Sequence, residues 1–156
     1  METILAQLFS NRILLSGLTA WFLAQFLKPF IEYPIHGRLK PGLWFASGGM
    51  PSSHSSLVTA TCLSAGLYEG FDSAAFAVAF AIAMIVIYDA AGVRLQAGLQ
   101  AKKINELVDE LLSGHPISQE TLKEVIGHTP RQVLAGILLG IAVAGSVFSV
   151  FPPVLR

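Results

Sequence analysis

The stretch SAAFAVAFAIAMIVIYD, Ser73–Asp89, gives the clearest structural signal in this sequence. Between the serine and the aspartate it contains only alanine, aromatic, methionine and branched aliphatic side chains. A bilayer core about 30 Å thick is crossed by a helix of about 20 mostly apolar residues. The stretch therefore predicts a transmembrane helix.

The rest of the chain has the same apolar character. Its 156 residues are 53% hydrophobic and 13% charged, and the mean hydropathy is +0.63. Soluble domains carry about 25% charged residues. This composition excludes a disordered chain, a collagen-like chain and a nucleic-acid binder with a basic surface. The single cysteine, Cys62, excludes an internal disulfide and a cysteine-based zinc site. We expect an integral, multi-pass membrane protein.

Three further segments can cross a membrane. They are Ile13–Tyr33, Ser55–Gly70 and Pro130–Phe151. The middle one is short and needs Ser53 and His54 to extend it inside the protein. The last one ends at Pro152 and Pro153, which cannot continue a helix. Small residues recur along these spans and allow helices to approach closely; they include Ala79, Ala81, Ala83, Gly136, Gly140 and Gly145.

The segment between the third and fourth spans is more polar. Leu95–Leu112 has apolar residues at helical spacing and charged residues between them, which predicts an amphipathic helix lying at the membrane surface. A short helix over Ser118–Ile126 is expected next, with Gly127 as its stop. The predicted fold is an all-α, small polytopic membrane helix bundle. It has about four transmembrane helices, and one or two short amphipathic helices between the third and fourth, in a single domain over residues 1–156. Its small size leaves room for a homodimer.

Basic residues lie mostly on one side of this predicted bundle. Four spans place both termini on one face, and eight of the ten Lys and Arg residues fall at the opposite face. They are Lys28, Arg38, Lys40, Arg94, Lys102, Lys103, Lys123 and Arg131. The positive-inside rule then assigns this face to the cytoplasm.

Polar residues from four distant stretches are predicted to meet at the level of this basic face. They are Lys28 at the end of the first span, Ser52, Ser53 and His54 at the start of the second, Asp89 and Arg94 at the end of the third, and His128, Arg131 and Gln132 at the start of the fourth. Several of them have an ordinary alternative: Lys28 can snorkel, Ser52 and Ser53 can cap a helix, and Asp89 with Arg94 can form a structural ion pair. A single histidine at a helix start is also usually structural. Two histidines opening two membrane helices on one side favour a site, because ionisable groups at this depth are costly.

The chemistry of these groups indicates an anion site. Lys28, Arg94 and Arg131 supply positive charge, and Ser53 with the free N–H groups of a helix start supplies donors. Phosphate is the obvious anion at a membrane surface. Two imidazoles can divide phosphoryl transfer, one attacking phosphorus and the other protonating the leaving oxygen. Their ordinary pKa of about 6.5 suits both roles.

Two of these stretches resemble known motifs. GGMPSSHSS, Gly48–Ser56, resembles the P-S-G-H motif of the type 2 phosphatidic acid phosphatase and vanadium haloperoxidase superfamily. GHTPRQVLAGILLG, Gly127–Gly140, resembles the third motif of that superfamily. Together with YDAAGVRLQAG they are similar to its divergent branch of haloperoxidase-related membrane proteins. The likeness covers nearly the whole chain.

The resemblance implies a role for most of these residues. It assigns His128 as the nucleophile that attacks phosphate and His54 as the general acid. Ser52 and Ser53 correspond to phosphate-binding donors, and Lys28 to the lysine of the first motif.

Two family positions differ in this chain. Leu122 stands where the family has an arginine, which Arg94 can replace from another helix end. Gln132 stands where the family has an aspartate that orients the nucleophile, and Asp89 is a candidate for that task. These changes put the turnover rate, and activity itself, in question.

The predicted function is that of a lipid phosphatase without a cofactor, and the resemblance implies that it needs no metal. It would hydrolyse a phosphate monoester such as phosphatidic acid, phosphatidylglycerophosphate or an isoprenoid phosphate through a phosphohistidine. A catalytically silent member that binds anionic lipid headgroups or scaffolds membrane partners is the alternative. The third hypothesis is a small transporter or channel subunit, although four short spans are few for that role.

Overall fold

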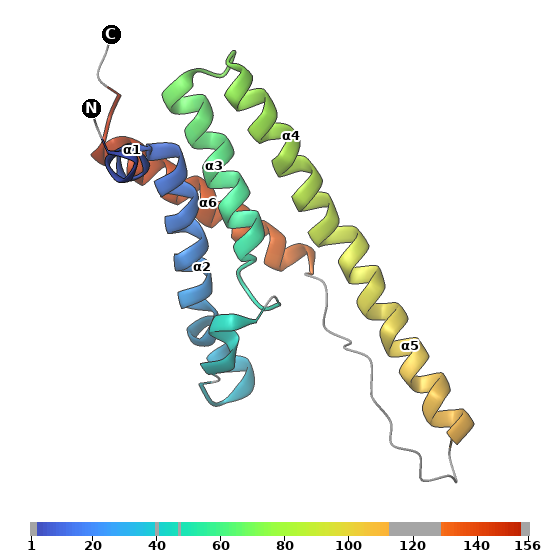
Figure 1. Cartoon of the computed structure of the whole chain (residues 1–156). Coiled ribbons are helices and arrows are strands. Elements are labelled where there is room, and N and C mark those ends of the chain that lie inside the picture. Colours follow the sequence, from blue (N-terminus) through green and yellow to red (C-terminus); the bar gives the residue numbers. More distant parts are fainter. Residues whose placement is uncertain (1–2, 40, 47, 113–128, 154–156) are drawn as a thin grey trace.

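The structure, a computed structural model, describes residues 3–39, 41–46, 48–112 and 129–153, and every regular element in these ranges is helical (Figure 1). In chain order they are α1 (Ile4–Ser10), α2 (Arg12–His36), the 3-10 turn η1 (Pro41–Phe45), α3 (Ser53–Glu69), α4 (Ala74–Tyr88), the π turn η2 (Asp89–Val93), α5 (Arg94–Leu112) and α6 (Pro130–Val150). The prediction of an all-α membrane bundle is confirmed. The short helix α1 was not predicted.

Three of these helices are long and apolar enough to cross a membrane. The spanning stretches are Arg12–Pro34, Ala74–Gly92 and Pro130–Val150. The second predicted span, which forms α3, has only 17 residues, and at 1.5 Å per residue these give about 26 Å. It packs against α2, α4 and α6 and lies between α2 and α4 in Figure 1. Because three other helices pack against α3 and bury most of its serines, its short length and its serines are tolerated.

Polar side chains at the first helical turns explain where the helices begin. In five cases the side chain before the helix accepts a hydrogen bond from the backbone N–H three residues later. These N-caps are Thr3 for α1, Asn11 for α2, Ser52 for α3, Ser73 for α4 and Thr129 for α6. The predicted capping role of Ser52 is therefore confirmed.

Stripes of small residues at every fourth position hold α2, α3 and α6 together. On α2 and α3 all members are fully buried, and on α6 they are buried. The stripes are Ser16, Ala20 and Ala24, which the buried Lys28 follows one turn later; Ser52, Ser56, Ala60 and Ser64; and Gly136, Gly140 and Ala144. Ala20 and Ala60 share a core cluster with Ala144. Since lipid is as apolar as these side chains, close packing drives this association.

The two ends of the bundle differ in character. At one end the guanidinium of Arg12 lies 4.1 Å from the ring centroid of Phe151, and the hydroxyl of Tyr68 donates to the carbonyl of Phe151 at 2.7 Å. The start of α2 and the ends of α3 and α6 therefore lie together. The opposite end holds the end of α2 and the starts of α3 and α6. This is the end at which the sequence predicts a cluster of polar residues.

The amphipathic segment forms the predicted helix but takes a different direction. α5 covers the expected residues, and it continues α4 through η2 in nearly one line (Figure 1). A π turn keeps the helix unbroken, so α5 follows the axis of a spanning helix instead of lying along the membrane surface. The predicted orientation is therefore wrong for this structure. The second short helix, over Ser118–Ile126, lies outside the described residues.

Candidate functional site

The starts of α3 and α6, which carry the two recognised motifs, are joined directly. The backbone N–H of Ser52 donates to the carbonyl of Gln132 at 3.0 Å. One turn along α6, a Cβ on Gly136 would collide with the carbonyl oxygen of Ser52 and would lie 3.0 Å from Cβ of Ser55. Two segments about 80 residues apart in sequence therefore meet at backbone distance.

A serine network closes the start of α3. The hydroxyl of Ser52 accepts from the backbone N–H of Ser55 at 3.3 Å and from the hydroxyl of Ser55 at 3.0 Å. The hydroxyl of Ser56 donates to the carbonyl of Ser52 at 2.9 Å. Ser52, Ser53, Ser55 and Ser56 are all buried. A serine hydroxyl can donate as well as accept, so Ser52 can cap the helix and still offer its proton to an anion.

The end of α2 holds the loop that leads into this network. Lys28 is fully buried, and its ammonium donates to the carbonyl of Ala46 at 2.8 Å. One turn later, Oε1 of Glu32 accepts from the backbone N–H of Met50 at 3.1 Å. A Cβ on Gly49, whose φ is 90°, would lie 3.2 Å from the same Oε1. Lys28 therefore points into the protein, and the snorkelling alternative is wrong.

Glu32 also holds the loop before α3, and the sequence analysis did not predict this role. It follows Lys28 by four residues, the spacing at which opposite charges face each other on a helix. That spacing, at membrane depth, was the signal that could have identified it.

The remaining candidate residues take different positions. His54 lies exposed on the first turn of α3, and Arg131 lies exposed on the first turn of α6. Asp89 is half-buried in η2, which contacts α6. Arg94 begins α5, but its side chain lies outside the described part, and His128 lies outside the described residues altogether. In the described ranges, no group of three or more His, Cys, Asp or Glu residues is placed to hold a metal ion.

Gln132 acts as a helix cap. Its Oε1 accepts from the backbone N–H of Thr129 at 2.9 Å, and its own N–H donates to the hydroxyl of Thr129 at 3.4 Å. This reciprocal pair is a capping box. The amide that replaces the aspartate of the family motif therefore has a structural task.

We expect Lys28→Met to destabilise the loop before α3. The change leaves the carbonyl of Ala46 without its buried donor, a loss of about 1–3 kcal/mol. Cys62 is the only cysteine and is buried, so its reaction with a thiol-reactive dye on heating reports unfolding. Lys102→Met is the matched control, because that side chain is 59% exposed. Equal melting temperatures for the two variants would contradict a structural role for Lys28.

These features define a class of protein: a multi-pass helical membrane protein in which polar groups gather where two helix starts meet. The sequence model described as the Divergent PAP2 family matches residues 9–143, and the chain belongs to that family. The resemblance seen in the motifs is thereby confirmed.

One curated relative supports the same assignment. The "Uncharacterized membrane protein YuiD" of Bacillus subtilis (strain 168) is 40% identical over 146 residues. The alignment covers 86% of this chain and 92% of that protein. No solved structure matches the chain.

Proposed function

We propose that this protein is an integral membrane lipid phosphatase that removes phosphate from a lipid phosphate monoester through a phosphohistidine. The observation that carries the proposal is the hydrogen bond from Ser52 to Gln132, which joins the starts of α3 and α6. His54 lies two residues after Ser52, and His128 directly precedes the N-cap Thr129 in the sequence. Membership of the PAP2-related family supports the same chemistry.

The reaction proceeds in two balanced steps. In the first, the neutral imidazole of His128 attacks phosphorus, the bond from phosphorus to the lipid oxygen breaks, and His54 donates its proton to that oxygen. In the second, His54 takes a proton from water as the water oxygen attacks phosphorus. The bond between phosphorus and His128 then breaks. Inorganic phosphate leaves, and both imidazoles return to their starting protonation states.

Cations and hydrogen-bond donors stabilise the phosphoryl oxygens during both steps. Lys28 uses one of its three N–H bonds on Ala46, which leaves two for the anion. Ser52, Ser53, Arg94 and Arg131 complete the set, and Asp89 orients an imidazole. Donors and charges fixed before the reaction need little reorganisation as charge develops. We also propose that the site faces the cytoplasm, because most Lys and Arg residues of the sequence fall on this side, and we therefore favour substrates that are made there.

Phosphate release tests this proposal directly. We expect purified protein in mixed micelles to release inorganic phosphate from phosphatidic acid, phosphatidylglycerophosphate or an isoprenoid phosphate. We expect the rate to be the same with and without a metal chelator, because the two imidazoles replace a metal. Absence of release from every one of these lipids would overturn the enzymatic proposal.

A catalytically silent lipid-binding protein is the second candidate. The engagement of Gln132 in a capping box favours it, because a neutral amide cannot stabilise an imidazolium as a carboxylate does. In vesicle flotation such a protein would bind phosphatidic acid over phosphatidylcholine and release no phosphate. Turnover in the assay above decides against it.

A further inference from the structure

The short first helix, α1, leaves large apolar side chains uncovered. All of its residues are exposed. Four of them are large and apolar, with exposed fractions of 77% for Ile4, 65% for Leu5, 48% for Leu8 and 69% for Phe9. Contiguous apolar surface of this kind marks a site of interaction with a partner or a membrane.

The side chains of α1 divide into two faces. The four apolar residues follow one another at spacings of one, three and four positions, which places them on one side of a helix with 3.6 residues per turn. The polar residues Gln7 and Ser10 lie on the other side, and no residue of α1 is charged. An amphipathic helix of this kind is suited to lie in the plane of a membrane surface.

A single residue, Asn11, joins α1 to α2 and fixes the direction of α1. Its backbone N–H donates to the carbonyls of Gln7 at 3.1 Å and Leu8 at 3.3 Å, which ends α1. Its side chain accepts from the backbone N–H of Leu14 at 3.0 Å, which begins α2. Figure 1 shows α1 running across the start of α2 instead of extending its axis. All of α1 therefore stays at the level at which α2 begins.

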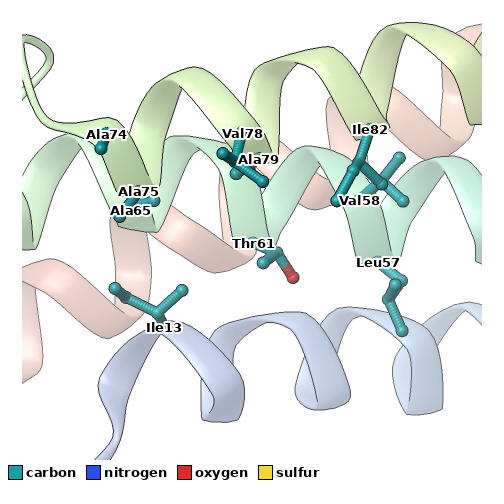
Figure 2. Close-up of a pocket in the computed structure, with 10 residues that line it drawn as sticks. All are labelled: Ile13, Leu57, Val58, Thr61, Ala65, Ala74, Ala75, Val78, Ala79 and Ile82. Carbon is teal, nitrogen blue, oxygen red and sulfur yellow. The ribbon is translucent and has the colours of Figure 1, made fainter.

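This level is the edge of the membrane-spanning part of the bundle. The first spanning stretch starts at Arg12, directly after Asn11. The next residue, Ile13, already lines the apolar groove between α2, α3 and α4 that Figure 2 shows. The guanidinium of Arg12 and the hydroxyl of Tyr68 lie at the same end of the bundle. The apolar surface of the bundle thus begins where α1 ends, and α1 lies between hydrocarbon and headgroups.

We propose that α1 is an interfacial anchor that binds the membrane surface at the end of the bundle opposite the candidate site. Its apolar face turns toward the acyl chains and leaves water, while Gln7 and Ser10 stay hydrated among the headgroups. The partner is the bilayer itself and not another protein. Because Asn11 links the two helices without slack, the anchor also fixes how deeply α2, which carries Lys28, sits in the bilayer. The proposal does not depend on the proposed function.

The depth of nitroxide labels on α1 tests the proposal in the full-length protein, reconstituted in vesicles of phosphatidylcholine and phosphatidylglycerol. Cys62→Ala removes the only cysteine, and Cys62→Ser gives a second background. Single labelled cysteines then replace Leu5 and Phe9 on the apolar face, or Gln7 and Ser10 on the polar face. Oxygen concentrates in hydrocarbon, whereas a nickel chelate stays in water. The ratio of collisions with oxygen to collisions with nickel should be severalfold higher at residues 5 and 9 than at residues 7 and 10.

Two reference positions calibrate this ratio. Ile85→Cys reports lipid, because Ile85 is 68% exposed on the spanning part of α4, and Lys102→Cys reports water, because that side chain is 59% exposed on α5. Ratios on α1 that all equal the Lys102 value would overturn the anchor. Few collisions with either reagent at residues 5 and 9 would overturn it as well, because protein would then cover α1. Dipolar broadening between labels would identify that protein as a second copy of the chain.

Discussion

Replacing His128 by alanine is expected to lower phosphate release from lipid by at least about three orders of magnitude. The imidazole is the proposed nucleophile, and removing a nucleophile from a cooperating pair costs nearly the whole catalytic effect. The loss should be equal for p-nitrophenyl phosphate, because both substrates need the same attack on phosphorus. Activity and the amount of an acid-labile phosphoenzyme, trapped in denaturant at alkaline pH, should fall together.

The substitution His54→Ala distinguishes the catalytic roles of the two imidazoles. A general acid contributes about 10²–10⁴-fold to a reaction with a poor leaving group. The variant should lose lipid hydrolysis to this extent and keep most of its activity on p-nitrophenyl phosphate, whose leaving group needs no proton. His115→Ala, in a third histidine outside the candidate set, should match wild type. Lipid hydrolysis that persists in His128→Ala would remove the proposed nucleophile.

Gly136→Val is expected to cause the largest loss of stability among substitutions that leave every candidate side chain in place. Even a Cβ at this position collides with the carbonyl oxygen of Ser52 and lies 3.2 Å from its Cβ. A backbone atom cannot rotate away, so α6 must move from α3. We expect a cost of about 3 kcal/mol, at the upper end for overpacked cores. Reaction of Cys62 with a thiol dye on heating measures the change.

The same substitution should also lower phosphate release, because it separates Ser52 from Gln132. Gly145→Val is the matched control on the same helix, since nothing lies within 4 Å of a Cβ added there. We expect this control to have the melting temperature of the wild-type protein and to release phosphate at the wild-type rate. If the Gly136→Val variant has the same melting temperature as the Gly145→Val control, α3 and α6 do not pack closely in the membrane.

The spans and helix starts could be predicted from sequence because they depend on local properties. A continuous apolar run such as Ser73–Asp89 has to be helical in a bilayer, where backbone groups find no water. The capping role of Ser52 likewise depends on a backbone group three residues away. The direction of α5 could not be predicted, because it depends on whether the chain bends or continues at η2. The amphipathic pattern of its side chains is the same in both cases.

The same distinction between local and tertiary properties applies to the candidate site. Residue type and spacing are enough to single out the cations, the serines and the two histidines. They did not reveal that Lys28 and Glu32 turn inward to hold the loop before α3, or that Gln132 is engaged in a cap. The contacts of Lys28 and Glu32 join residues that are distant in the chain. The cap is local, because Thr129 and Gln132 are three residues apart, and the pattern of a threonine followed three residues later by a glutamine could have indicated it.

The sequence by itself determined that this protein is an apolar helical bundle of the PAP2-related kind, because hydrophobicity and motif spacing are properties of short stretches. Only the tertiary structure decided that α3 is the central helix, packed against α2, α4 and α6, and that its start meets the start of α6. It also decided that an apolar groove opens between α2, α3 and α4. The physical reason is close packing: the glycines of α6 allow two backbones to touch, and the register of that contact determines which faces of α3 remain open.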